Sequence, residues 1–77
     1  MVKNIDWGEF KAFRATNLKE QDNFMTLLDF LKSYYNLFSV YDIFDTLNND
    51  ETSKMMLDKR NITTAEELEP YLFKAIH

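Results

Sequence analysis

The side chains that could do chemistry are few, and their spacing forms no recognisable catalytic group. Nucleophilic catalysis needs an activated Cys, Ser, Thr or Lys beside a base, but the chain has no cysteine and its only histidine is the terminal residue, His77. There is no HExxH or CxxC spacing for a metal, and a single glycine cannot build a phosphate-binding loop. Because 77 residues are too few to enclose an ordinary substrate cavity and keep a core, we expect no enzymatic activity, no metal and no cofactor.

The stretch "DTLNND" at residues 45–50 has the densest oxygen ligands. It lacks the glycine and the ligand spacing of a calcium-binding loop. Asn and Asp favour turns and helix caps. We therefore interpret the stretch as the end of one helix and the cap of the next.

Charged side chains are unevenly distributed along the chain, whose net charge is −4. Residues 1–38 carry five basic and five acidic side chains, whereas residues 39–77 carry four basic and eight acidic ones. Direct binding to nucleic acid requires a basic patch, and none is visible. The helices that would enter a DNA groove carry carboxylates instead, at Asp42, Asp45, Glu66, Glu67 and Glu69. Direct nucleic-acid binding is therefore not expected.

Apolar side chains must hold this short chain together, since no disulfide can form. The composition is 45% hydrophobic and 16% aromatic, with one glycine and one proline, which favours helices over a loop-rich or β-rich fold. The longest apolar run, Met55 to Leu57, is too short to span a bilayer. The segment "MVKNIDWGEF" lacks the features of a signal peptide. We expect a cytoplasmic protein without a membrane segment.

The spacing of apolar residues predicts helices separated by short joints. The first spans about 6–15, with Asp6 and Glu9 as a capping box. The second spans about 18–37 and follows a cap at Thr16 or Asn17. The third begins after Ser39, and the later helices cover about 51–59 and the segment from 63 or 64 onward.

The helix over about 18–37 is predicted to be central. At 100° per residue its apolar side chains share a 180° arc, which is wide enough to contact several neighbouring helices. The arc comprises Phe24, Leu27, Leu28, Phe30, Leu31, Tyr34, Tyr35, Leu37 and Phe38. We therefore predict an all-α fold for residues 1–77, a compact single domain of four to five short helices around this amphipathic helix.

The third and last helices have distinct local signals. Ser39 is a plausible N-cap for the third helix, whose inward face is formed by Val40, Ile43, Phe44 and Leu47. Asp42 and Asp45 then point outward. In the last helix Thr64 and Glu67 fit a capping box, and Pro70 either kinks the helix or begins it after a short turn.

Protein binding is the leading function by elimination. Some apolar side chains do not fit the buried face of their own helix, and interfaces are enriched in Trp, Tyr, Phe and Met. Burial inside a small bundle is the alternative explanation for them. With the neighbouring acids, the candidate binding residues are Trp7, Met25, Tyr41, Asp42, Asp45, Glu51 and Phe73. The expected partner is another protein or a second copy of the chain.

Two other functions remain as alternatives. The acids of the second half could occupy the nucleic-acid site of another protein, as a mimic of nucleic acid would. The second alternative is a small helical DNA-binding regulator. The richness in Asn, Lys, Asp, Phe and Tyr suggests A+T-rich coding DNA, which fits a modulator encoded by a phage, another mobile element or a low-G+C bacterium.

Overall fold

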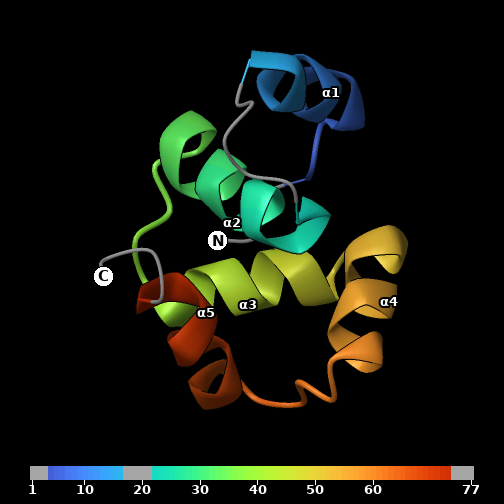
Figure 1. The fold of residues 1–77 in the computed structure, drawn as a ribbon. Helices are drawn as coiled ribbons and strands as arrows, with labels where there is room; N and C mark the ends of the chain where they lie inside the picture. Colours follow the sequence, from blue (N-terminus) through green and yellow to red (C-terminus); the bar gives the residue numbers. More distant parts are fainter. Residues whose placement is uncertain (1–3, 17–21, 74–77) are drawn as a thin grey trace.

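The structure, a computed structural model, describes residues 4–16 and 22–73, apart from the side chain of Phe73. These residues form five α-helices and one 3₁₀ turn, and no strand occurs among them. The helices are α1 (Trp7–Thr16), α2 (Asn23–Tyr34), α3 (Val40–Asn48), α4 (Glu51–Lys59) and α5 (Glu69–Phe73), and the 3₁₀ turn η1 (Ala65–Leu68) precedes α5 (Figure 1). The predicted all-α fold is confirmed.

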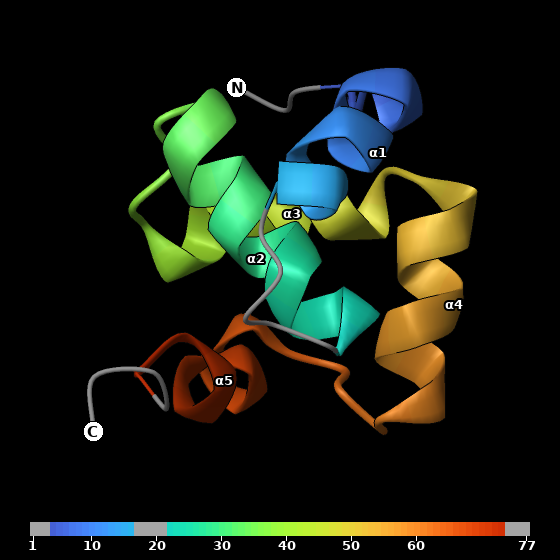
Figure 2. The same cartoon turned by 45° about the horizontal axis from the view of Figure 1, so that its top comes forward.

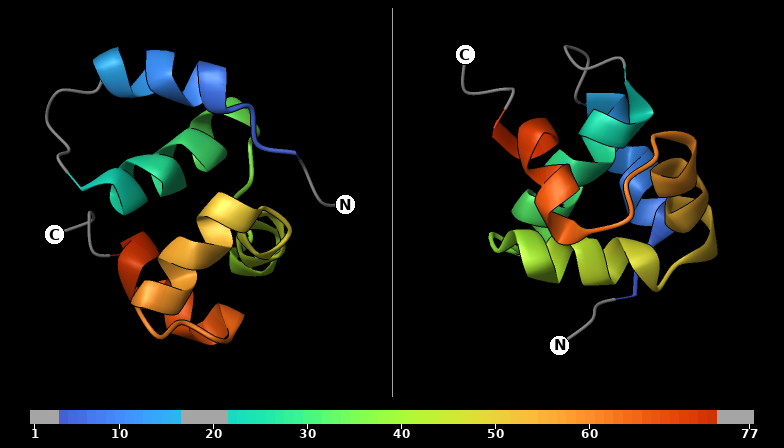
Figure 3. Two further views of the ribbon diagram at one scale, coloured as in Figure 1. Left: turned by 90° about the vertical axis from the view of Figure 1, so that its right-hand side faces the viewer. Right: turned by 90° about the horizontal axis from the view of Figure 1, so that it is seen from below.

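Helix α2 occupies the centre of the molecule, with α1 on one side and α3 on the other (Figures 1 and 2). Helices α1 and α2 run antiparallel (Figure 3, left). Helix α4 follows the end of α3, while η1 lies beside α3 and α5 packs against α2. No helix in the described part of the chain is both long and apolar enough to cross a membrane.

One apolar core draws side chains from every helix. Its members include Phe10 of α1, Leu57 of α4, Leu68 of η1 and Leu72 of α5. Helix α2 contributes the most, with Phe24, Leu27, Leu28, Phe30 and Leu31. The central position of this helix is thus explained by an apolar face that meets three neighbouring elements.

Helix α1 is fixed at its start by the tyrosine that directly follows α2. The Asp6 carboxylate accepts the Glu9 N–H at 3.1 Å, as the predicted cap requires. The Asp6 N–H donates to the Tyr35 hydroxyl at 2.8 Å, and that hydroxyl donates to the Asn4 carbonyl at 2.9 Å. Tyr35 therefore takes the position that Glu9 has in the predicted capping box, and it joins α1 to the end of α2.

The prediction of a second helix over 18–37 is wrong at both ends. The N-cap is Asp22, whose carboxylate accepts the Phe24 N–H at 2.8 Å; Thr16 belongs to α1, and Asn17 lies outside the described residues. The helix ends at Tyr34 because Asn36 adopts a left-handed φ of 57°. The apolar residues that were predicted to continue the helix, Leu37 and Phe38, lie beyond its end.

Two side chains near the end of α2 that were predicted to be buried are exposed. Phe38 lies outside the helix and is 76% exposed, and Tyr34 is 50% exposed, although its ring stacks on Phe30. Leu37, between them, turns into the core. Helical period no longer sets the direction of a side chain once the helix has ended, which is why the predicted arc fails for Phe38; Tyr34 is the last residue of α2 and is only partly covered.

Helices α3 and α4 have the predicted positions. The Ser39 hydroxyl accepts the Tyr41 N–H at 3.2 Å, and Asp50 caps α4 by accepting the Ser53 N–H at 3.0 Å. Helix α4 ends where Asn61 takes a φ of 56° and lets the Ile62 N–H donate to the Leu57 carbonyl at 3.0 Å. Ile62 is thereby buried.

The last segment follows the second of the two alternatives for Pro70. Thr64 and Glu67 form the predicted capping box at the start of a short 3₁₀ turn, and α5 begins at Glu69. Pro70 is the second residue of α5, where its missing N–H has no helical acceptor. No kink is needed.

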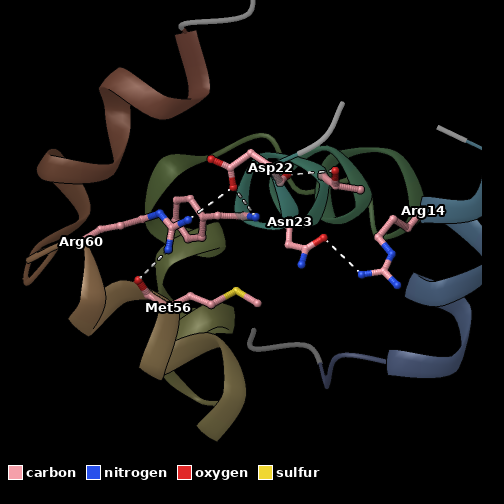
Figure 4. A network of polar contacts seen from close by, with 7 residues as sticks. Arg14, Asp22, Asn23, Met56 and Arg60 are labelled. Atoms are coloured by element: carbon pink, nitrogen blue, oxygen red, sulfur yellow. Dashed lines mark hydrogen bonds and ion pairs between the residues drawn. The ribbon is translucent and has the colours of Figure 1, made fainter. Parts of the chain in front are cut away.

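An arginine connects the end of α4 to the start of α2. The Arg60 guanidinium lies 4.5 Å from the centre of the Phe24 ring. It donates to the Asp22 carboxylate at 3.3 Å and to the Met56 carbonyl at 3.2 Å (Figure 4). Arg14 makes a similar polar connection from α1 to Asn23 at 3.2 Å.

Candidate functional site

Exposed aromatic side chains lie on both sides of the cap of α3. Phe38 precedes Ser39 directly, and Tyr41, which is 58% exposed, follows two residues later. Neither aromatic ring belongs to the core cluster. Together with the exposed acids Asp42 and Asp45 of α3, and with Glu66, which contacts Tyr41, they make up what we call the aromatic–acidic surface: Phe38, Tyr41, Asp42, Asp45 and Glu66.

Phe38 stays largely exposed, although its position directly before the N-cap of α3 would allow it to pack against that helix. An apolar residue before an N-cap often packs against the fourth helical residue, which here is Ile43. Ile43 is fully buried by other side chains while Phe38 stays exposed. The joint is nevertheless anchored, since Leu37 is buried on one side and Ser39 caps α3 on the other. The Phe38 side chain is therefore exposed, while the backbone on both sides of it is held by buried or capping residues.

Tyr41 is held in place by an acid from η1. Its hydroxyl donates to the Glu66 carboxylate at 3.1 Å. This hydrogen bond, followed by the negative charges of Glu66 and Glu69, raises the pKa of Tyr41 above its ordinary value of 10.0. The Tyr41 phenol is thus neutral at physiological pH, and its hydroxyl has a hydrogen-bond partner on η1.

The acids of this surface lie where two stretches without basic residues meet. Residues 33–53 and 61–73 contain no Lys or Arg, and α3 and η1, which belong to these stretches, pack side by side. Asp42 and Asp45 are exposed on α3, as the helical period predicted. Asp45 lies one helical turn after Tyr41. These two stretches therefore supply the surface with exposed rings and carboxylates and with no Lys or Arg.

Trp7 and Met25, two of the predicted binding residues, make packing contacts within the fold. Trp7 is half-buried, packs edge-on against Phe10 at 5.4 Å and donates from Nε1 to the Asp50 carboxylate at 3.1 Å. Met25 is half-buried and packs against the core. The side chain of Phe73 lies outside the described residues.

Glu51 lies on α4, away from the aromatic rings in the sequence and on a different helix. It lines a shallow hollow together with Lys54, Met55 and Asp58. A second hollow lies on the other side of Met55, which is 62% exposed. Basic and acidic side chains alternate along this part of α4, so Met55 offers an exposed apolar residue in a mixed-charge setting.

The sequence pattern predicts that Phe38 lies in the buried arc of the helix over about 18–37 and does not indicate it as a member of the surface. Glu66 is among the acids that the nucleic-acid-mimic alternative places on a surface, but its contact with Tyr41 was not predicted. One signal was available for Phe38: the predicted cap at Ser39 placed it in a joint, where helical period does not apply. Glu66 meets Tyr41 only through tertiary packing across 25 residues.

Comparisons with known proteins do not assign this surface. No family model matches the chain, and no curated protein or solved structure is significantly similar to it. Within the described ranges, no group of three or more His, Asp or Glu side chains could hold a metal ion.

Proposed function

We propose that this protein is a non-enzymatic binding protein that recognises another protein through the aromatic–acidic surface. The observation that carries the proposal is the exposure of Phe38 on anchored backbone, three residues before the exposed Tyr41 in the chain. Single exposed hydrophobic side chains are ordinary. Two aromatic rings three residues apart, outside the core, expose apolar area that a partner would remove from water.

The rigidity of the surface supports the same proposal. Binding costs less free energy when the contacting side chains are already ordered. Tyr41 is oriented by Glu66, and the backbone at Phe38 is fixed by the cap of α3. Aromatic residues also supply much of the binding free energy at protein interfaces. Because proteins without cysteine are compatible with a reducing compartment, we also propose that the protein binds its partner in the cytoplasm.

Site-specific photo-crosslinking in the producing cells tests this proposal. Benzoylphenylalanine replaces Phe38 in one variant and Met55, the comparably exposed side chain of α4, in the control. We expect a discrete covalent adduct of higher mass from position 38 and none from position 55. Adducts of equal yield at the two positions, or none at position 38, would overturn the proposal.

A second candidate function uses the charge of the surface without its rings. The two stretches that lack Lys and Arg could occupy a nucleic-acid site on another protein. The exposed carboxylates of α3 and η1 favour it. This function predicts that binding survives Phe38→Ser and is lost when Asp42 and Asp45 are neutralised, whereas our main proposal predicts that Phe38→Ser abolishes binding.

A further inference from the structure

The charges around the exposed rings determine which kind of partner can cover them. The Asp42 and Asp45 carboxylates make no hydrogen bond or ion pair within the described residues, and the Glu66 carboxylate accepts only from Tyr41 there. A purely apolar partner would remove these carboxylates from water without pairing them, which is unfavourable. A partner that covers Phe38 and Tyr41 must therefore bring positive charge.

The fold already contains one site of this chemistry. Arg60 lies over the Phe24 ring at 4.5 Å and pairs with Asp22 at 3.3 Å (Figure 4). A ring and a carboxylate thus hold one guanidinium within the protein. The aromatic–acidic surface offers rings and carboxylates of the same kind, and the two stretches that build it contain no Lys or Arg to fill it.

We propose that the aromatic–acidic surface receives arginine side chains of the partner protein, stacked on Phe38 or Tyr41 and paired with the neighbouring carboxylates. This inference rests on the proposed function and specifies the chemistry of the partner. Arginine suits the surface better than lysine, because its planar guanidinium stacks on a ring while it donates to a carboxylate in a fixed fork.

Titration with short peptides, followed by amide chemical shifts, tests the inference on the whole chain. The probes are hexa-arginine, hexa-lysine and hexa-citrulline, the last being the uncharged counterpart of the first. We expect hexa-arginine to shift the amides of residues 38–45 and of Glu66, hexa-lysine to bind there more weakly, and hexa-citrulline to shift none. Equal binding of the citrulline peptide, or shifts centred on Glu51 and Asp58, would overturn the inference.

Matched variants separate the contribution of the ring from that of the charge. Phe38→Leu retains apolar area but removes the ring, and we expect hexa-arginine to bind it about two- to fivefold more weakly. Asp42→Asn combined with Asp45→Asn should weaken binding further and flatten its dependence on salt. Met55→Leu is the control and should bind as the original chain does. Unchanged affinity in the first two variants contradicts the inference.

Failure of this inference is distinguishable from failure of the proposed function. If position 38 crosslinks to a partner while hexa-arginine does not bind the surface, the protein-binding function stands and arginine recognition is wrong. If position 38 gives no adduct, the protein-binding function is wrong whatever the peptide does.

Discussion

Two buried threonines in the core differ in whether their hydroxyl groups are hydrogen-bonded. The Thr26 hydroxyl donates to the Asp22 carbonyl at 3.1 Å, at the first turn of α2. The Thr46 hydroxyl, on α3, has no partner among the described residues, although the side chain is fully buried. A buried polar group without a partner costs about 1–3 kcal/mol. At the scale of the residue, Thr46 is therefore a site where the fold is less stable than it could be.

Replacing Thr46 by valine should stabilise the protein. The substitution removes the unpaired hydroxyl and keeps the shape of the side chain, so we expect the free energy of unfolding to rise by about 1 kcal/mol. Thr26→Val is the matched control and should lower it by about 1 kcal/mol, because it removes a hydrogen bond that is made. Urea denaturation measures both. A destabilised Thr46→Val variant would show that the Thr46 hydroxyl is paired in solution.

At the scale of the element, helix ends determined how much of the fold could be predicted. Helices α3 and α4 were predicted well because polar residues such as Ser39 supply strong caps beside regular apolar patterns. The end of α2 was missed because apolar residues continue through Asn36, and a left-handed φ at an asparagine is not visible in a hydrophobic pattern. Phe38 was misplaced for the same reason.

The candidate site was predictable where one helix alone defines it. Asp42 and Asp45 point outward on α3, as its period predicted, and Tyr41 is exposed beside them. The hydrogen bond between Tyr41 and Glu66 joins residues from two elements, so no local pattern could reveal it. The packing contacts of Trp7 likewise depend on the tertiary position of Asp50.

The Asp50 carboxylate connects α4 to α1, and removing it should disrupt a contact with each helix. It caps α4 by accepting from Ser53 and it accepts the Trp7 indole N–H. We expect Asp50→Ala to lower the free energy of unfolding by about 1–2 kcal/mol and to alter Trp7 fluorescence. Asp50→Asn keeps an acceptor and should retain most of the stability, while the exposed Asp58→Ala should change it by about 0.5 kcal/mol at most. Loss of stability in all three variants alike would contradict a specific capping role.

Glu67 should make the stability of η1 depend on pH. Hydrogen bonds from Thr63, followed by those from Thr64, lower the pKa of the Glu67 carboxyl below its ordinary value of 4.5. A lowered pKa in the folded state means that the stabilisation is present above about pH 4.5 and is lost as the pH falls through the folded value. Glu67→Gln should therefore show a flatter pH dependence of unfolding in this acid range. An unchanged slope, measured by urea denaturation at several pH values, would contradict the effect.

At the scale of the whole molecule, charge argues against pairing of this surface with itself. A two-fold symmetric dimer places the same patch on both chains, so Asp42, Asp45 and Glu66 would face their own copies. The chain as a whole also carries a net charge of −4. These repulsions favour a different protein as the partner.

The isolated protein should therefore be a monomer of 9.2 kDa at neutral pH and low salt. Sedimentation equilibrium at about 100 μM, a concentration at which a micromolar dimer would be well populated, measures this directly. If a dimer formed and Phe38→Ser dissociated it, the surface would be a self-association interface and the partner would be a second copy.

The central claim is that Phe38 binds another protein. Its most direct test is quantitative affinity capture from the producing cells, with the original chain, Phe38→Ser and the control Met55→Ser as baits. We predict that the original chain and Met55→Ser recover equal amounts of one protein. Phe38→Ser should recover at least about tenfold less of it, as expected for an aromatic side chain central to an interface. Equal recovery by all three baits, with each shown to be folded by circular dichroism, would contradict the claim.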